Sequence, residues 1–205
     1  MQVGMKSECC IKIVLLDLDG TIIDTMGLYA DKAAELISEA IGISIEKARK
    51  LYLKLAGRPF IEQLELIGIE PPLSDALSRV FEEWKRDLLK RVKVDDNVAH
   101  LISVLRRRFK VYISTNNECS VVLDNKHLTR LVDGVLCYDK STGSRKGEPH
   151  IRMLMENENV SPCNILFIGD SEYDIRIYEE LGVEVVRTNG LWRSDIDLDS
   201  IRGCT

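Results

Sequence analysis

The chain has 205 residues, of which 45% are hydrophobic and 30% are charged, and its formal net charge is −5. This length favours one domain, or one domain with a sizeable insertion, and the apolar content is sufficient for a buried core. The acidic balance argues against nucleic acid as a partner. No apolar run is long enough to span a bilayer, so we expect no membrane partner either.

The first residues, 1–10, lack the apolar centre of a signal peptide, and we therefore expect a cytoplasmic protein. The six cysteines include no CxxC pair, which argues against a zinc site or a thioredoxin-like site. Without an export signal, we expect these cysteines to be reduced thiols. Cys119 has no evident base near it in the sequence, so we interpret it as structural.

The chain begins with a strand and continues with helices. Residues 11–18 form a nearly continuous apolar run, which is typical of a strand buried on both faces of a parallel sheet. From residue 24 to about residue 93 we find only helical periodicity. Start and stop signals predict helices at 24–41 (or from 25), 44–55, 59–68 and 74–91. About seventy helical residues are thus inserted after the first strand.

Strands and helices alternate in the rest of the chain. The expected strands are 110–115, 135–137, 165–168 and 183–186. Four helices are expected between and after these strands. The first begins at 95 or 96, the second spans 118–131, the third begins at about 149, and the fourth spans 172–181. This alternation predicts an α/β fold with a doubly wound parallel sheet, with ligands at the carboxyl ends of its strands.

Two carboxylates follow the first strand within the segment DLDGT, residues 17–21. Side chains alternate along an extended backbone, so Asp17 and Asp19 would point to the same side. Two carboxylates close together repel each other, and a hard divalent cation such as magnesium would offset that charge. The pair also suits a carboxylate nucleophile beside a carboxylate that serves as acid and base.

Further polar residues lie at or near the ends of the later strands: Thr115, Asn116, Lys146, Asp170 and Asp174. If the sheet is parallel, the groups that end strands share one edge. A hydroxyl, backbone amides and a lysine can hold phosphoryl oxygens, and a metal held by carboxylates can neutralise the phosphate. These residues therefore indicate phosphoryl transfer.

The sequence resembles the haloacid dehalogenase superfamily of phosphatases, in the branch of phosphoglycolate phosphatase and beta-phosphoglucomutase. The four motifs that carry the resemblance occur in the family order between residues 11 and 187. They are DLDGT at 17–21, ISTN at 113–116, KGEP at 146–149 and GDSEYD at 169–174. There are two departures. Gly147 stands where the family usually has proline, and Ser114 precedes Thr115, so the choice of hydroxyl depends on the alignment.

The resemblance implies a role for each matching residue. Asp17 would be the nucleophile, Asp19 the general acid and base, and Lys146 would steady both the nucleophile and the phosphate. The expected substrate-binding residues are Thr21, Thr115, Asn116 and Arg58. Mg²⁺ would be bound by Asp17, the main-chain carbonyl of Asp19 and Asp170, with Asp174 as a supporting carboxylate, directly or through water.

The resemblance also implies a division into domains. Residues 1–22 and 94–205 would form the α/β core, and residues 23–93 the small helical cap that closes over the site and selects substrates. Arg58, in the segment GRP at 57–59, could pair with a second acidic group of the substrate, or could equally be a surface or packing residue.

We therefore expect a Mg²⁺-dependent phosphatase that acts on a small phosphorylated metabolite through an aspartyl-phosphate. A phosphosugar mutase would use the same core, and a non-catalytic phospho-ligand-binding module is the alternative outside enzymes. A dehalogenase has no need for Asp19 or a metal, and a phosphonate hydrolase would need a cap lysine, for which Lys54 is the nearest candidate.

Two of the candidate site residues also have a simpler interpretation. Lys146 could be a solvated loop residue, and Asp170 could be the N-cap of a helix. The oligomeric state stays open.

Overall fold

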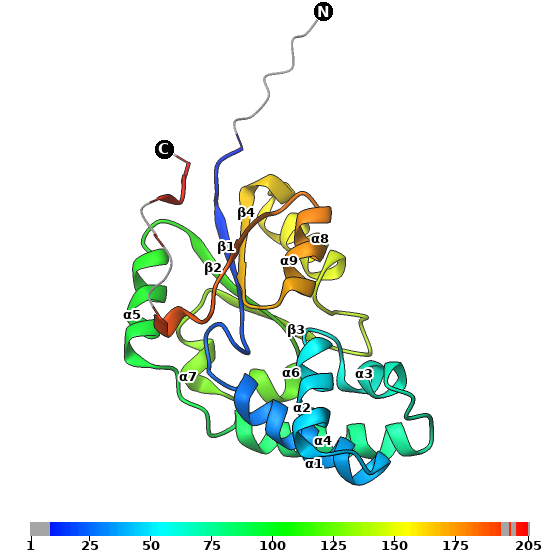
Figure 1. The fold of residues 1–205 in the computed structure, drawn as a ribbon. Coiled ribbons are helices and arrows are strands. Elements are labelled where there is room, and N and C mark those ends of the chain that lie inside the picture. Colours follow the sequence, from blue (N-terminus) through cyan, green and yellow to red (C-terminus); the bar gives the residue numbers. More distant parts are fainter. Residues whose placement is uncertain (1–8, 194–196, 198–199, 205) are drawn as a thin grey trace, which may run out of the picture.

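The computed structural model describes residues 9–193, 197 and 200–204. A parallel sheet forms its centre, with strand order β3-β2-β1-β4-β5 (Figure 1). The strands are β1 (Ile13–Asp17), β2 (Lys110–Glu118), β3 (Gly134–Tyr138), β4 (Ile165–Gly169) and β5 (Glu184–Arg187). The predicted doubly wound α/β fold is confirmed.

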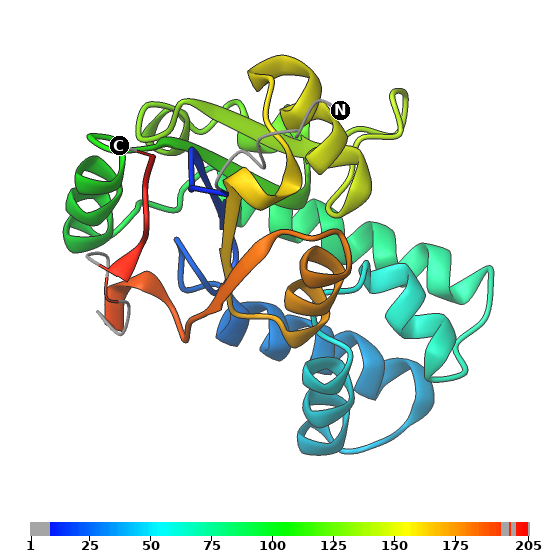
Figure 2. The same cartoon turned by 90° about the horizontal axis from the view of Figure 1, so that it is seen from above.

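All five residues of the central strand β1 are buried, as its apolar run predicts. Its alternate side chains enter two different hydrophobic clusters. Val14 and Leu16 pack with α5 (Asp96–Leu105), α6 (Cys119–Val122) and α7 (Lys126–Thr129). Ile13 and Leu15 pack with α8 (Glu148–Glu158) and α9 (Glu172–Glu180). Figure 2, seen from above, shows helices on both sides of the sheet.

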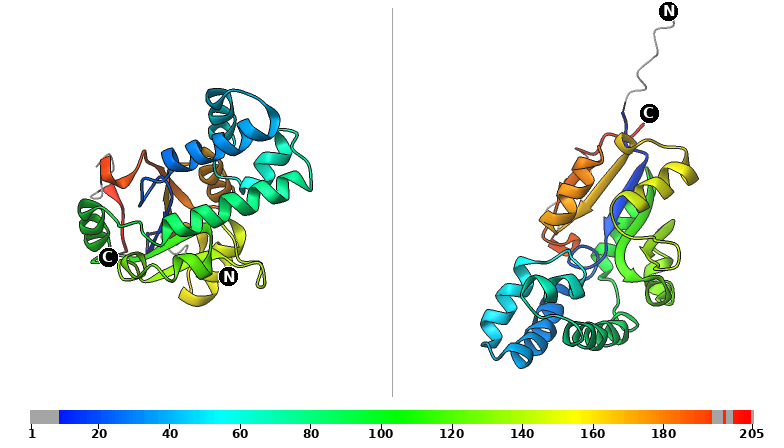
Figure 3. Two further views of the ribbon diagram at one scale, coloured as in Figure 1. Left: turned by 90° about the horizontal axis from the view of Figure 1, so that it is seen from below. Right: turned by 90° about the vertical axis from the view of Figure 1, so that its right-hand side faces the viewer.

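The helical segment after β1 has a hydrophobic cluster of its own. It contains α1 (Met26–Ile41), α2 (Ile45–Lys54), α3 (Phe60–Leu66) and α4 (Leu73–Leu89), whose buried side chains pack on one another. Several aromatic rings meet there, and Phe60 and Phe81 lie 4.3 Å apart between centroids. Figure 3 shows these helices together at one end of the sheet.

Local signals set several of the element ends. The side chain of Ser44 accepts a hydrogen bond from Lys47 N at the start of α2, and Asp95 accepts one from Asn97 N at the start of α5. Gly42 ends α1 with a left-handed backbone. The chain also contains short 3₁₀ helices at Pro162–Asn164 and Leu191–Arg193. Among the described residues, no helix is both long enough and apolar enough to cross a membrane.

Two expectations need correction. Residues 118–131 were expected to form one helix, but the structure has the short helices α6 and α7, because the Asn125 side chain caps α7 and interrupts the run.

The expectation that the cysteines are reduced thiols is also wrong. The six cysteines, all within the described residues, form the disulfides Cys9–Cys163, Cys10–Cys204 and Cys119–Cys137. The expected absence of a signal peptide concerns residues 1–10, of which 1–8 lie outside the described residues, so it stays a prediction.

Candidate active site

Asp17 ends the central strand and lies at the bottom of the site. Its side chain is almost fully buried, and Lys146 Nζ lies 2.6 Å from its Oδ1. The same Oδ1 accepts a hydrogen bond of 2.7 Å from the Leu18 backbone N–H. Lys146 Nζ is also 2.8 Å from Asp174 Oδ2, so one ammonium joins two carboxylates that come from different elements.

The electrostatics of this cluster are dominated by burial. Burial raises the pKa of Asp17 well above its usual range, Lys146 opposes that rise, and Asp174 and Asp170 add to it. Burial alone would lower the pKa of Lys146, but the adjacent Asp17 and Asp174 carboxylates outweigh this and raise it. Burial likewise raises the pKa of Asp170. The protein alone therefore gathers more negative charge here than Lys146 neutralises.

Asp19 is held by two hydrogen bonds, one on each carboxylate oxygen. The Thr25 hydroxyl donates to Oδ1 at 2.7 Å, and Asn117 Nδ2 donates to Oδ2 at 2.6 Å. Thr25 occupies the N-cap position of α1, but its side chain makes no capping bond there and contacts Asp19 instead. These two bonds fix the orientation of the Asp19 side chain. Among the described residues, Asp19 forms no ion pair with Lys146.

The end of β2 supplies three neighbouring polar residues. Thr115 is buried, lines the cavity, and accepts a hydrogen bond of 3.1 Å from the Asn117 N–H to its Oγ1. Asn116 Oδ1 accepts a hydrogen bond of 3.0 Å from the Lys146 backbone N–H. Ser114 is fully buried and makes its contacts below the site, with His150 and Tyr178, so Thr115 is the hydroxyl that faces the cavity.

Asp170 and Asp174 follow β4. Asp170 lies against the backbone of Gly20, where an added Cβ would come within 2.3 Å of Asp170 Oδ2. The N-cap of α9 is Ser171, whose hydroxyl accepts from the Asp174 N–H, so Asp170 does not cap that helix. Asp174 is almost fully buried, and its Oδ1 has no hydrogen-bond partner among the described residues.

A cavity of about 630 Å³ lies between the strand ends and the helical segment. Its core side includes Asp17, Lys146 and Asp170, and its helical side includes Tyr29, Phe81 and Lys85. The loop with Arg58 meets the core directly. The Arg58 guanidinium lies 4.7 Å from the centroid of the Tyr173 ring, and a Cβ added to Gly57 would be 2.4 Å from Ser171 Oγ.

The structure brings together nearly all the residues that the motifs indicated. Those that line the cavity are Asp17, Asp19, Arg58, Thr115, Asn116, Lys146, Asp170 and Asp174. Thr21 is the exception. Its side chain is completely buried, it is not in the cavity lining, and its hydroxyl has no hydrogen-bond partner among the described residues. The arrangement therefore does not support substrate binding by the Thr21 side chain.

Sequence reasoning missed Thr25 and Asn117, which both hold Asp19. A signal for Asn117 was present in the strand periodicity, because a residue two positions after Thr115 points to the same side of an extended chain. We predicted that the strand ends at Thr115, whereas β2 continues to Glu118. For Thr25 the sequence indicated only a helix cap.

The fold and the site together define a hydrolase with a doubly wound core and a helical insertion after its first strand. The chain belongs to the haloacid dehalogenase-like hydrolases, whose family profile matches residues 14–188. The resemblance that the four motifs indicated is thereby confirmed. No curated protein gives a significant match to the sequence.

Solved structures with this fold are similar over most of the chain. A candidate phosphoglycolate phosphatase from Lactobacillus plantarum is 19% identical, with a TM-score of 0.71, over 95% of this chain and 93% of that one. Beta-phosphoglucomutase from Clostridium difficile is 19% identical, with a TM-score of 0.67, over 86% and 84%. CbbY from Rhodobacter sphaeroides, solved in complex with phosphate, is 18% identical, with a TM-score of 0.64, over 93% and 91%. At these identities the likeness shows the fold.

Proposed function

We propose that this protein is a Mg²⁺-dependent phosphatase that hydrolyses a small phosphate monoester through an aspartyl-phosphate on Asp17. One observation carries the proposal. Asp17 is paired with Lys146 at 2.6 Å, while Asp19, which lines the same cavity, is held separately by Thr25 and Asn117. Two carboxylates with such different surroundings suit two different roles, nucleophile and proton carrier.

The residues present fit a magnesium ion. Asp17 and Asp170 supply hard oxygen donors in a cluster with surplus negative charge, and Asp174 Oδ1 is a buried oxygen without a hydrogen-bond partner in the described part. No group of three His, Cys, Asp or Glu side chains forms a ready-made metal site within those residues. Mg²⁺ commonly uses only one or two carboxylates, with water and substrate phosphate as further ligands.

Asp17 and Asp170 would therefore hold the ion, with Asp174 in support. The motif resemblance implies that Asp19 would contribute its main-chain carbonyl, and its carboxylate, held by Thr25 and Asn117, would then serve as the proton carrier. The ion would neutralise carboxylate and phosphate charge, so that one anion can approach another. Gly20 matters here because any Cβ at that position would displace the Asp170 carboxylate.

The proposed reaction has two steps. A carboxylate oxygen of Asp17 attacks the phosphorus, the bond from phosphorus to the ester oxygen breaks, and Asp19 donates a proton to that leaving oxygen. Asp19 then takes a proton from a water molecule, which attacks the phosphorus, breaks the acyl phosphate bond and releases inorganic phosphate. Lys146 and Thr115 stabilise the charge on the phosphoryl oxygens in both steps.

The helical side of the cavity would select the leaving group, as residues 23–93 would act as a cap. A volume of about 630 Å³ accommodates a small metabolite, and Arg58 adds a guanidinium to the lining. We expect Arg58 to contact an acidic group of the substrate, in competition with its contact to Tyr173.

The proposal is tested with p-nitrophenyl phosphate and a panel of phosphate esters. We expect turnover that requires Mg²⁺ and is lost on chelation. Asp17→Asn should abolish it, and Asp19→Asn should lower kcat by about 10² to 10⁴, the usual contribution of a general acid and base. A wild-type protein that hydrolyses no ester of the panel with Mg²⁺ refutes the proposal. On a sugar phosphate, isomerisation without net release of phosphate indicates the mutase instead.

A further inference from the structure

The loop that carries Lys146 is fixed in an unusual way. Gly147 has φ 93° and ψ −140°, a backbone conformation that residues with a side chain rarely adopt. Its N–H donates a hydrogen bond of 3.3 Å to the Tyr178 hydroxyl. Proline, which the related motif has at this position, has φ near −65° and no N–H, so it could make neither feature. Glycine gives the loop more backbone freedom than proline would, so the contacts of its N–H help to set its conformation.

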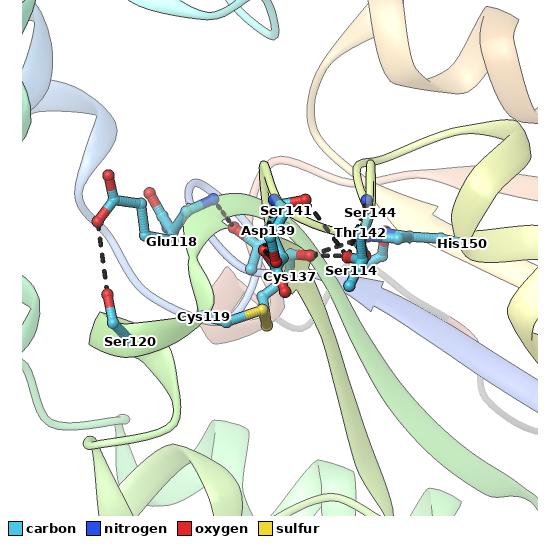
Figure 4. The surroundings of a disulfide bond; sticks show 12 residues. Ser114, Glu118, Cys119, Ser120, Cys137, Asp139, Ser141, Thr142, Ser144 and His150 are labelled. Carbon is cyan, nitrogen blue, oxygen red and sulfur yellow. Dashed lines mark hydrogen bonds between the residues drawn. A yellow bond between two sulfur atoms is a disulfide. The ribbon is translucent and has the colours of Figure 1, made fainter.

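The groups around this N–H form a buried polar series beneath the site. The Tyr178 hydroxyl lies 2.7 Å from Ser114 Oγ, and Ser114 Oγ lies 2.7 Å from His150 Nδ1. His150 Nε2 lies 3.4 Å from the Cys137 carbonyl oxygen. Ser114, His150 and Tyr178 are all completely buried. Figure 4 shows Ser114 and His150 beside Cys137 and its disulfide to Cys119.

The hydrogen bonds of this buried polar series can all have the same direction, from the Gly147 N–H as the first donor to the Cys137 carbonyl as the last acceptor. Burial lowers the pKa of His150 to about 4, so the ring is neutral near pH 7 and carries one N–H. With the proton on Nε2, His150 donates to Cys137 O and its Nδ1 accepts from the Ser114 hydroxyl. Ser114 then accepts from the Tyr178 hydroxyl, and Tyr178 accepts from the Gly147 N–H. Every donor has one acceptor, an arrangement in which successive bonds strengthen one another.

Further contacts fix both ends of this hydrogen-bonded series, the Cys137 carbonyl and the Gly147 N–H. The Cys137 carbonyl also accepts a hydrogen bond of 2.8 Å from the Ser144 hydroxyl, and the Cys119–Cys137 disulfide ties β3 to the start of α6. At the other end, the Lys146 N–H donates to Asn116 while the next N–H, that of Gly147, donates to Tyr178. Two consecutive backbone donors are thus fixed by two separate elements.

We propose that Tyr178, Ser114 and His150 are positioning residues that hold the Lys146 ammonium against Asp17 by fixing the Gly147 N–H. The inference rests on the proposed function, because Lys146 is taken to act on the phosphoryl group there. None of the three side chains needs to touch the substrate. Their effect is to keep the 2.6 Å contact of Lys146 with Asp17 in place during turnover.

Tyr178→Phe is the main test, because it removes one hydroxyl and leaves the ring that stacks on Phe167 at 4.0 Å. We expect kcat for p-nitrophenyl phosphate to fall by about 10-fold to 100-fold, as for a displaced catalytic group, with KM changed by less than about 3-fold. Rates are expressed per folded molecule, measured by circular dichroism. The matched control is Tyr112→Phe, which loses a hydroxyl bonded to Glu158 at the other end of β2 and should keep the wild-type kcat. An unchanged kcat in Tyr178→Phe overturns the proposal.

Nuclear magnetic resonance provides a readout that does not depend on activity. We expect the side-chain nitrogen shifts of His150 to report the Nε2–H tautomer, and the Gly147 amide to exchange at least about 10-fold faster in Tyr178→Phe than in wild type or Tyr112→Phe. A His150 Nδ1–H tautomer, or equal Gly147 exchange in Tyr178→Phe, overturns the inference. An inactive wild-type protein refutes the proposed function instead, so the two failures are distinguishable.

Discussion

Asn117 and Asp19 are 98 positions apart in the chain, yet Asn117 Nδ2 donates a hydrogen bond of 2.6 Å to Asp19 Oδ2. The contact joins the end of β2 to the loop after β1, two neighbouring strands of the sheet. Together with Thr25 it fixes the direction in which Asp19 presents its carboxylate. An acid and base that must first donate and then accept a proton depends on such orientation.

Asn117→Ala should lower kcat for a generic phosphate ester by about 10-fold or more, because a loosened general acid is misplaced for proton transfer. KM should change little, since Asn117 would hold Asp19 rather than the phosphate. Steady-state kinetics measure both. Asn157→Ala, an exposed change in α8, is the control and should behave as wild type. A large rise in KM with unchanged kcat would contradict the orienting role.

Lys146→Met should abolish turnover and also destabilise the protein. The change leaves Asp17 and Asp174 buried without their common cation, and removal of one partner of a buried ion pair costs about 3–5 kcal/mol. Urea unfolding measures the loss. Lys140→Met removes the charge of an exposed loop lysine and should leave both stability and turnover unchanged. Equal stability of the two variants would show that the buried carboxylates do not need Lys146.

Gly147→Pro restores the residue that the related motif contains, yet here it should reduce activity. Proline conflicts with φ 93° and removes the N–H that Tyr178 accepts, so we expect a kcat at least about 10-fold lower through displacement of Lys146. Gly68→Pro is a matched control, because Gly68 has φ 89° and its N–H bonds to Glu65 O in the helical segment. That variant should lose stability but keep its turnover per folded molecule. Normal turnover in Gly147→Pro would contradict this account of the loop.

His150 should make the protein less stable in mild acid. Burial, with a smaller contribution from Lys146, lowers its pKa from 6.5 to about 4 in the folded protein, while the unfolded chain binds the proton near pH 6.5. Stability from this group is therefore complete above pH 6.5 and is lost as the pH falls toward 4, in total about 3 kcal/mol at 1.36 kcal/mol per pKa unit.

Urea unfolding at several pH values tests this, with His150→Asn as the variant and His127→Asn, an exposed site, as the control. The decline between pH 6.5 and 4 should be shallower in His150→Asn than in the wild type and unchanged in His127→Asn. Parallel pH curves for all three proteins would show that His150 titrates normally.

The contribution of each disulfide to stability should increase with the logarithm of the length of the loop that it closes. Cys119–Cys137 spans 18 positions and Cys10–Cys204 spans 194, so their removal by paired Cys→Ser changes should cost about 3 and about 5 kcal/mol in the loop-closure model. Thermal unfolding with and without a dithiol reductant gives a parallel measurement. Thiol titration of the untreated, denatured protein should find no free thiol, and six free thiols would contradict the pairing.

Most of the sheet and the composition of the site could be predicted from the sequence, because both depend on local signals. Continuous apolar runs marked β1 and β4, and the polar residues that end them fell at one edge because parallel strands share it. The motif order then implied which carboxylate is paired with Lys146. These features need no knowledge of distant contacts.

The features that were missed depend on tertiary contacts. Asn125 interrupts the helix expected at 118–131 because its side chain caps α7 and also donates to the carbonyls of Leu89 and Val92, far away in sequence. Thr25 looked like a helix cap, but its hydroxyl reaches Asp19. The cysteine pairs were not recognisable because partners up to 194 positions apart meet only in the folded chain.

The Cys10–Cys204 bond has a topological consequence. Its two Cα atoms are 5.0 Å apart, and Ile11 pairs with Gly203 beside it, so nearly the whole chain forms one covalent ring. A single proteolytic cut in an exposed loop, such as the one at 139–143, would leave the two fragments joined by this disulfide. The same closeness makes residues 10 and 204 suitable for a short peptide linker, so that a circular permutant could open at that loop while retaining the order of strands in the sheet.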